Sequence, residues 1–375
     1  MMKVKFLERS LIGDAGAAVS SAREQLRALG IEFEETETGP DVLVFLTGGT
    51  EVEARQHVRD GSILLPLGIG NGLAASLEVK AWAEARGMPV SLVADQLRDP
   101  RLRNAFARLS SLSGCRIGII GEPSEWLIKS GDPTALAELG IVTERVLLDE
   151  VVALADDDPQ LTDRLAGSAG QATIGIESIR EAVRLYVGLK RIVGQRRLTG
   201  FALRCFDLIA GQGRTACLAL SLLNNEGVVA ACEGDLEALA TMLVATRFTD
   251  RPCFMANPAL FENGVLTLAH CTVNLSLVES HDLVTHFESG TGVSIRGRLS
   301  GDVYTVLRLG RGRKFFVVEA QRVPRPLSDF MCRTQVSLAV GADLLTRALG
   351  NHHIVVPGAW EAQLACLASL GWRRV

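Results

Sequence analysis

The chain has 375 residues, of which 47% are hydrophobic and 22% are charged, and this composition excludes a disordered or collagen-like protein. With 39 Lys and Arg against 43 Asp and Glu, the net charge of −4 leaves no basic surface for nucleic acid. The first residues lack a secretory signal pattern and no apolar run approaches the roughly 20 residues of a membrane-spanning helix, so we expect a cytoplasmic protein without membrane or nucleic-acid partners.

Short apolar runs alternate with helical patterns from the start of the chain to about residue 113. The apolar runs at 41–47, 62–67 and 89–94 have the length of buried strands, and 73–87 has the period of a helix. This alternation is typical of a parallel sheet covered by helices. It predicts an N-terminal Rossmann-like α/β domain over residues 1–113, at a chain length that supports more than one domain.

The same alternation restarts after residue 113 and continues to about residue 250. Its predicted strands are 116–121, 145–149, 201–206 and 228–232, and its long amphipathic helix is 176–195. We therefore predict a second α/β domain over residues 114–250. Each of these two domains would carry a parallel sheet.

The pattern changes after residue 250 to alternating, β-branched segments separated by glycines. These segments are 265–277, 292–299, 303–310 and 314–323, and helical patterns return only at 342–350 and 360–372, around a short strand at 353–358. Alternating segments of this kind are typical of antiparallel strands. We expect a β-rich third domain over residues 251–375, a small barrel or sandwich with flanking helices.

Two acidic residues follow the predicted strand at 228–232. Glu233 comes directly after the strand, and ligands of an open α/β sheet bind outside the carboxyl ends of its strands. Glu233 is therefore our candidate catalytic carboxylate. Asp235 precedes a helical pattern and is expected to cap that helix, with a role in the site as an additional possibility.

Histidines and an asparagine occupy further strand ends. His270 follows one predicted strand, His352 and His353 precede another, and Asn257 lies in the polar stretch between Glu233 and His270. A carboxylate with two histidines and an amide oxygen would form a mixed oxygen and nitrogen site for a divalent metal such as Mn²⁺. Each histidine alone is more often a structural residue than a ligand.

Residues 211–216 offer a competing signal. They read Gly-Gln-Gly-Arg-Thr-Ala, match GxGxxA between a predicted strand and a helix, and precede Glu233 by about the spacing of a ribose-binding acid. The alternative is that these glycines only turn the chain beneath a packed helix. In the first domain the glycines at 68–72 do not match this fingerprint, although Asn71 and the helix that follows it would hold an anion or a hydroxyl.

Eight cysteines are spread over the chain without the CxxC spacing of a zinc site. They lie mostly in apolar runs, and we expect them to be reduced residues that pack as small hydrophobic side chains.

Several segments together resemble one known family. They are 117–127, 204–209, 230–242, 268–273, 286–299 and 350–358. In their order and spacing they are similar to the L-fucose isomerase and L-arabinose isomerase superfamily, and the chain length resembles a compact branch of it. The resemblance implies two Rossmann-like domains followed by a C-terminal antiparallel β-barrel, assembled into a trimer or hexamer with active sites at subunit contacts.

The resemblance also implies a metal site and a reaction. Family members interconvert aldoses and ketoses with a divalent metal, usually Mn²⁺, held by two acids and one or two histidines. Glu233 matches the first acid, His353 the late histidine and His270 a histidine that some members place in the site. The second acid falls at Asn257, where an amide carries no charge and cannot shuttle a proton.

The leading hypothesis is a sugar isomerase in which Glu233 is the base of an enediolate mechanism. Asp235 would carry oxygen-bound protons, and Ser124 and Trp126 would contact the sugar, although Trp126 is equally suited to hydrophobic packing. The first alternative is a catalytically diverged sugar-binding homologue, favoured by Asn257. A weaker alternative is a nucleotide-dependent oxidoreductase that uses residues 211–216.

Overall fold

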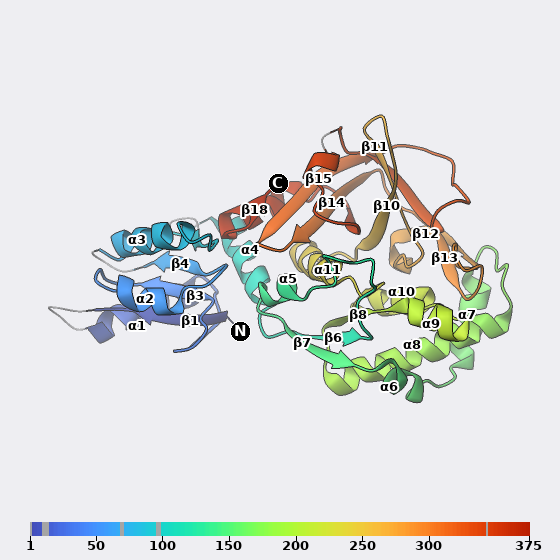
Figure 1. Cartoon of the computed structure of the whole chain (residues 1–375), viewed down its shortest axis with the longest axis horizontal. Coiled ribbons are helices and arrows are strands. Elements are labelled where there is room, and N and C mark those ends of the chain that lie inside the picture. Colours follow the sequence, from blue (N-terminus) through green and yellow to red (C-terminus); the bar gives the residue numbers. More distant parts are fainter. Residues whose placement is uncertain (1, 10–14, 68–70, 95–98, 343) are drawn as a thin grey trace.

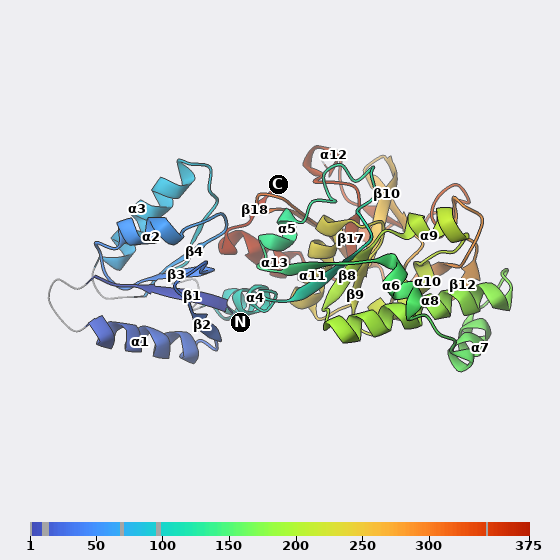
Figure 2. The same ribbon diagram turned by 60° about the horizontal axis from the view of Figure 1, so that its bottom comes forward.

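The computed structural model describes residues 2–9, 15–67, 71–94, 99–342 and 344–375 (Figure 1). Two parallel sheets and one large mixed sheet form the framework, and the strands of each come from one of the three predicted ranges. Figures 1 and 2 both place the first sheet at one end of the molecule, with α4 (Pro100–Ser110) at its junction with the rest. Among the described residues, no helix combines the length and apolar character needed to cross a bilayer.

The first parallel sheet, sheet A, has the strand order β2-β1-β3-β4-β5. This is the doubly wound order 2-1-3-4-5, in which helices cover both faces. Accordingly, every residue of the central strand β3 is buried. The elements of this part are β1 (Met2–Leu7), α1 (Ala15–Ala28), β2 (Phe33–Glu35), β3 (Val42–Phe45), α2 (Glu51–His57), β4 (Ile63–Pro66), α3 (Gly72–Glu84) and β5 (Ser91–Leu92).

The second parallel sheet, sheet B, has the order β7-β6-β8-β9, the same winding over fewer strands. Its switch in winding direction lies between β6 and β8, where ligands of such sheets usually bind. Its elements are β6 (Arg116–Ile120), α5 (Thr134–Ala137), β7 (Val142–Val146), α6 (Leu148–Ala153), α7 (Pro159–Ser168), α8 (Ile176–Arg196), β8 (Gly200–Leu203), α9 (Cys205–Gln212), α10 (Cys217–Asn225), β9 (Val229–Ala231) and α11 (Leu236–Thr249).

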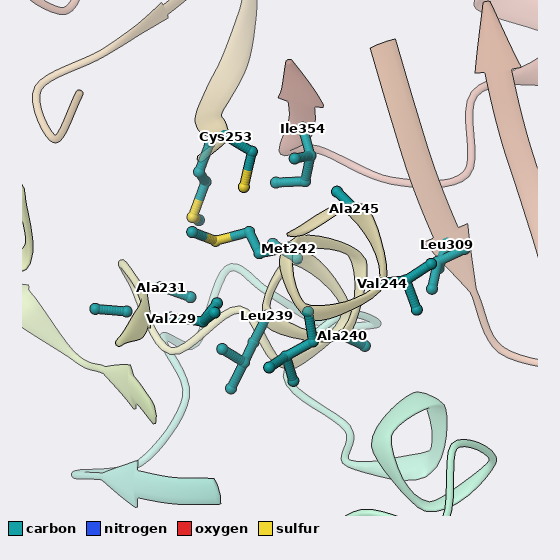
Figure 3. Close-up of a cluster of buried hydrophobic side chains, with 14 of the residues drawn as sticks. Val229, Ala231, Leu239, Ala240, Met242, Val244, Ala245, Cys253, Leu309 and Ile354 are labelled. Atoms are coloured by element: carbon teal, nitrogen blue, oxygen red, sulfur yellow. The ribbon is translucent and has the colours of Figure 1, made fainter. Parts of the chain in front are cut away.

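Helix α11 joins sheet B to the large sheet. Nearly all of its residues are buried, because it packs on more than one side and has no polar face. Figure 3 shows Leu239 and Met242 of this helix near β9 and Cys253, and Val244 near Leu309 of the large sheet. Helix α11 is therefore held by packing against sheet B on one side and the large sheet on the other.

The large sheet is built from antiparallel pairs, with one parallel pair at β18. Its order is β14-β17-β10-β11-β16-β15-β18, and β14 also pairs with β15, while β12 and β13 form a separate ribbon. Its elements are β10 (Phe254–Glu262), β11 (Val265–His270), η2 (Leu275–Leu277), β12 (Val278–Val284), β13 (Ser294–Leu299), β14 (Val303–Gly310), β15 (Lys314–Arg322), β16 (Thr334–Ala339), α12 (Leu344–Arg347), β17 (His353–Pro357), α13 (Glu361–Leu364), η3 (Ala365–Leu370) and β18 (Arg373–Arg374).

Several predicted segments differ from the structure. The strand predicted at 201–206 ends at Leu203, because α9 begins at Cys205. The strand predicted at 145–149 ends at Val146, because α6 begins at Leu148. The strand predicted at 265–277 ends at His270 and is followed by a separate 3-10 turn. Residues 211–216 do not follow a strand: they join α9 to α10, with Gly213 in the left-handed conformation that ends a helix.

Candidate metal centre and active site

Glu233 lies on a strained turn between β9 and α11. Its φ angle is 60° and that of the following Gly234 is 75°, so a non-glycine residue adopts the left-handed conformation. That conformation costs roughly 1–2 kcal/mol for an ordinary residue. The backbone N–H of Ser124, in the loop after β6, donates to the Glu233 carbonyl at 3.1 Å and helps to hold the turn. Strain of this kind is typical of functional positions.

Two histidine nitrogens face the Glu233 carboxylate. Oε1 of Glu233 lies 3.5 Å from Nε2 of His352 and 3.9 Å from Nε2 of His270. Two ligand atoms that each lie about 2.1 Å from a tetrahedral ion are about 3.4 Å apart. Both Nε2 atoms are buried and have no hydrogen-bond partner among the described residues. The spacing and the unpaired nitrogens together fit a bound metal ion, and these three residues form the candidate metal centre.

Adjacent strands of the large sheet bring the histidines together. His270 is the last residue of β11, His352 directly precedes β17, and β10 pairs with both of these strands. In β10, Asn257 pairs with Ala269, and its neighbour Ala256 pairs with His353. The metal centre therefore lies where these strand ends meet the carboxyl end of sheet B.

The second ring nitrogen of each histidine has a fixed partner. Nδ1 of His352 lies 2.8 Å from Oδ2 of Asp235, and Nδ1 of His270 lies 2.9 Å from the hydroxyl of Thr272. A carboxylate at Nδ1 holds the proton there and leaves the lone pair on Nε2. For His352 this arrangement directs the metal-binding lone pair toward Glu233.

Burial and mutual attraction set the charges in the centre. Burial lowers the pKa of His270 to about 4, so its ring is neutral. Burial acts in the same direction on His352, but its contacts with Asp235 and Glu233 outweigh burial and raise its pKa to about 9. Although burial favours the protonated acid, His352 holds the pKa of Glu233 at about 2. Without a metal, His352 is therefore a cation between two carboxylates.

A buried ion network lies behind His352. Arg308, on β14, is fully buried, and its guanidinium donates to Asp235 at 3.3 Å and to Glu237 at 3.1 Å. Lys129 donates to both carboxylate oxygens of Glu237, at 2.7 Å and 2.6 Å. Asp235 also caps α11 by accepting the N–H of Ala238 at 2.7 Å, as predicted. Nε of Arg311 lies 3.7 Å from Oε1 of Glu237, so several basic side chains surround the two acids at the start of α11.

A small cavity of about 30 Å³ adjoins the metal centre. Glu233, His270 and Asn257 line it, and Oδ1 of Asn257 is buried without a hydrogen-bond partner. Its wall also contains cysteines, all of which are free thiols as predicted, and the Sγ atoms of Cys205 and Cys232 lie 3.2 Å apart. The cysteines in this wall are Cys205, Cys217, Cys232, Cys271 and Cys332.

The loop after β6 places two predicted sugar-contacting residues beside Glu233. Nε1 of Trp126 donates to Oε2 of Glu233 at 2.8 Å, and its ring makes an edge contact with Phe206. Trp126 is 50% exposed, so part of its side chain remains accessible to solvent. Ser124 is buried, and its hydroxyl has no hydrogen-bond partner.

Two predicted residues lie outside the metal centre. The structure places His352, not His353, beside Glu233, because successive residues of a strand point to opposite faces. The ring of His353 instead packs against Phe316, and its Nδ1 donates to the carbonyl of Asn351. Asn71 is an exposed residue at the start of α3, in the sheet A part, and residues 68–70 before it lie outside the described residues.

Sequence reasoning missed Arg308, Glu237 and Lys129. The sequence gives one indication of Arg308, because it is a charged residue inside the apolar run of β14. A charge buried in such a strand requires a partner. The partners themselves come from distant parts of the chain. No local spacing identifies them.

No protein-family model matches the chain. The chain is similar to curated proteins named sulfoquinovose isomerase. The protein from Clostridium sp. (strain MSTE9) is 24% identical over 267 residues, which cover 64% of this chain and 59% of the relative. The protein from Alkalicoccus urumqiensis is 25% identical over 182 residues, which cover 46% of this chain and 40% of the relative. The chain therefore matches less than two thirds of either relative's length.

Proposed function

We propose that this chain is a metal-assisted aldose–ketose isomerase that acts on a sugar or sugar derivative and is related to the L-fucose isomerase and L-arabinose isomerase superfamily. The observation that carries the proposal is the cluster of Glu233, His270 and His352, whose facing atoms have the spacing of metal ligands. The relatives named as sugar isomerases support it independently. Nitrogen and oxygen donors of this kind suit Mn²⁺ and related divalent ions.

Aldose–ketose isomerisation moves a proton between C1 and C2 through an enediolate. A bound divalent metal would polarise the two sugar oxygens. Glu233 is the base that takes the proton from one carbon and returns it to the other, since one carboxylate can serve both carbons from one face of the sugar. Trp126 orients that carboxylate through its hydrogen bond and packs the accessible part of its ring against sugar C–H groups.

Asn257 provides the cavity with a neutral oxygen where a second acid would carry charge. Its unpaired, buried Oδ1 is free to complete the ligand set or to accept a sugar hydroxyl. This neutral residue also favours the second candidate, a sugar-binding homologue without turnover. If Asn257→Asp creates isomerase activity in a protein that has none, the second candidate is correct. If the substitution damages an existing activity, Asn257 belongs to a working site.

The nucleotide-dependent alternative lacks structural support. Residues 211–216 join two helices and not a strand to a helix, so they do not form the phosphate-binding turn of a dinucleotide fold.

The proposal extends to architecture and assembly. We propose domains over residues 1–113, 114–250 and 251–375, with the third closed as a β-barrel, and the pairing of β14 with β15 supports that closure. We also propose a trimer or hexamer. Half-exposed Trp126 and fully exposed Ile128 lie on the loop beside the site, where a second subunit would cover them. Analytical ultracentrifugation tests the assembly.

Solvent exchange tests the activity. Metal-replete protein is incubated in D₂O with a panel of aldoses and ketoses, and NMR follows deuterium at C1 and C2. We expect exchange with at least one sugar and a loss of roughly 10²–10⁴-fold in Glu233→Gln, the usual contribution of a general base. Glu125→Gln, an exposed acid on the same loop, is the control and should retain activity. Absence of exchange across the whole panel would refute the proposal.

A further inference from the structure

We infer that Arg308 is a positioning residue for the metal-binding imidazole of His352, an inference that rests on the proposed metal-assisted function. Arg308 does not line the cavity beside Glu233. It contacts the carboxylate of Asp235 and the backbone carbonyl of His352, which both hold His352 in place. Arg308 lies on β14, which carries neither of these residues. Arg308 thus acts on the metal centre through its neighbours.

The guanidinium holds the backbone and the side-chain partner of His352 at once. Nη1 of Arg308 donates to the carbonyl oxygen of His352 at 2.8 Å and to Oδ2 of Asp235 at 3.3 Å. The same Oδ2 lies 2.8 Å from Nδ1 of His352. Backbone, carboxylate and imidazole are therefore tied to one planar group, which sets where Nε2 points.

Only an arginine makes this set of contacts. Its second nitrogen, Nη2, reaches Glu237 at 3.1 Å while Nη1 holds the other two partners. A guanidinium presents its donors in a rigid fork, whereas a lysine ammonium is a compact charge on a flexible stem. The positive charge of Arg308 also faces the fully buried carboxylate of Asp235, which would otherwise lack a cationic partner on that side.

Gly350 leaves the space that the guanidinium occupies. A Cβ atom at this position would lie 2.9 Å from Nη2 of Arg308, closer than real Cβ contacts allow. Since Arg308 is fully buried, its side chain has little room to move away. Gly350→Ala should therefore displace the guanidinium while it leaves every charge of the network in place.

Metal titration of matched variants tests the inference. Mn²⁺ affinity is measured on the full chain for Arg308→Met, Arg308→Lys and Lys129→Met, and the visible spectrum of the Co²⁺-loaded protein reports the ligand geometry. Lys129→Met removes the same charge from Glu237, together with a hydrogen bond to the carbonyl of Leu349, but within the described part of the chain Lys129 makes no hydrogen bond or ion pair with Asp235 or His352. We expect Arg308→Met to bind Mn²⁺ about 10–100-fold more weakly, the usual effect of removing a group that orients a ligand. Arg308→Lys should be more stable than Arg308→Met but should not restore the Co²⁺ spectrum of the natural protein. Lys129→Met should bind Mn²⁺ within about twofold of the natural protein.

Gly350→Ala keeps the inference testable if Arg308→Met does not fold. We expect weaker Mn²⁺ binding and an altered Co²⁺ spectrum in Gly350→Ala, and neither change in Gly194→Ala, where the added methyl meets open space. Equal metal affinities in Gly350→Ala and the natural protein, or in Arg308→Met and Lys129→Met, would overturn the positioning role. Failure of the natural protein to bind Mn²⁺ would instead refute the proposed metal centre.

Discussion

At the scale of residues, strand ends identified most of the candidate site. Glu233 follows the buried strand β9, His270 is the last residue of β11, and the capping role of Asp235 followed from the helix pattern after it. The choice between His352 and His353 was not predictable, because neighbouring strand residues point to opposite faces and both lie beside the same apolar run. Only the register of β17 against β10 decides which imidazole faces Glu233.

The raised pKa of His352 predicts how metal binding depends on pH. Without metal, the pKa of His352 is about 9, while those of Glu233 and His270 are about 2 and about 4. A metal must therefore displace one proton, from His352. We expect Mn²⁺ affinity to rise about tenfold per pH unit between about pH 6.5 and 9 and to level off above.

The same pKa gives the opposite trend for the stability of the metal-free protein. Because the folded pKa of His352 lies above the ordinary value of 6.5, its ion pairs stabilise the fold fully below about pH 6.5. That stabilisation is lost as the pH rises through 9. Mn²⁺ titrations followed by EPR, beside unfolding curves at each pH, measure both trends. A metal affinity independent of pH would show that His352 is not protonated in the free protein.

At the scale of elements, the patterns of strands and helices were predictable and their ends were less so. The helix expected at 176–195 is α8, and the strands expected at 303–310 and 314–323 are β14 and β15. The sequence left the turn at 211–216 open between a phosphate-binding turn and a simple turn of the chain, because its glycines fit either, and only the strand expected before it was wrong. The structure resolves this through Gly213, which ends α9.

The start of α11 depends on the charge of Asp235 more than on its cap. Asp235→Asn keeps a good capping side chain but removes one of the two carboxylates that pair with the buried charge of Arg308. Breaking a buried ion pair costs about 3–5 kcal/mol. Because Glu237 still pairs with Arg308, we expect the free energy of unfolding to fall by an amount near the lower end of this range. Asp158→Asn, at the cap of α7, should change the free energy of unfolding by less than about 0.5 kcal/mol. Equal effects of the two substitutions in denaturant unfolding would contradict this account.

At the scale of the whole molecule, the two parallel sheets were predictable from the alternation of strand and helix. The junctions between the parts were not, since they join residues far apart in the sequence. Arg313, in the turn between β14 and β15, is one such junction: its backbone and guanidinium donate to Glu138, and its side chain lies against Gly61 of the sheet A part. Burial lowers the pKa of Arg313 to about 10.

Gly61→Ala should loosen the attachment of the sheet A part. The added Cβ would lie 1.9 Å from the Arg313 guanidinium, at a backbone φ of +81°. Gly87→Ala is the matched control, because Gly87 has a φ of +73° but open space around it. We expect Gly61→Ala to cost about 1–3 kcal/mol more than the control, as overpacking usually does. Equal unfolding midpoints for the two variants would show that the Arg313 side chain moves away from the added methyl group without loss of stability.

The position of a bound metal tests the central claim most directly. Crystals of the full chain loaded with Mn²⁺ are measured at a wavelength where manganese scatters anomalously. The account predicts one strong anomalous peak within bonding distance of the Glu233 carboxylate and of Nε2 of both His270 and His352. A peak at His353, or no peak among these three side chains in metal-replete protein, would contradict it.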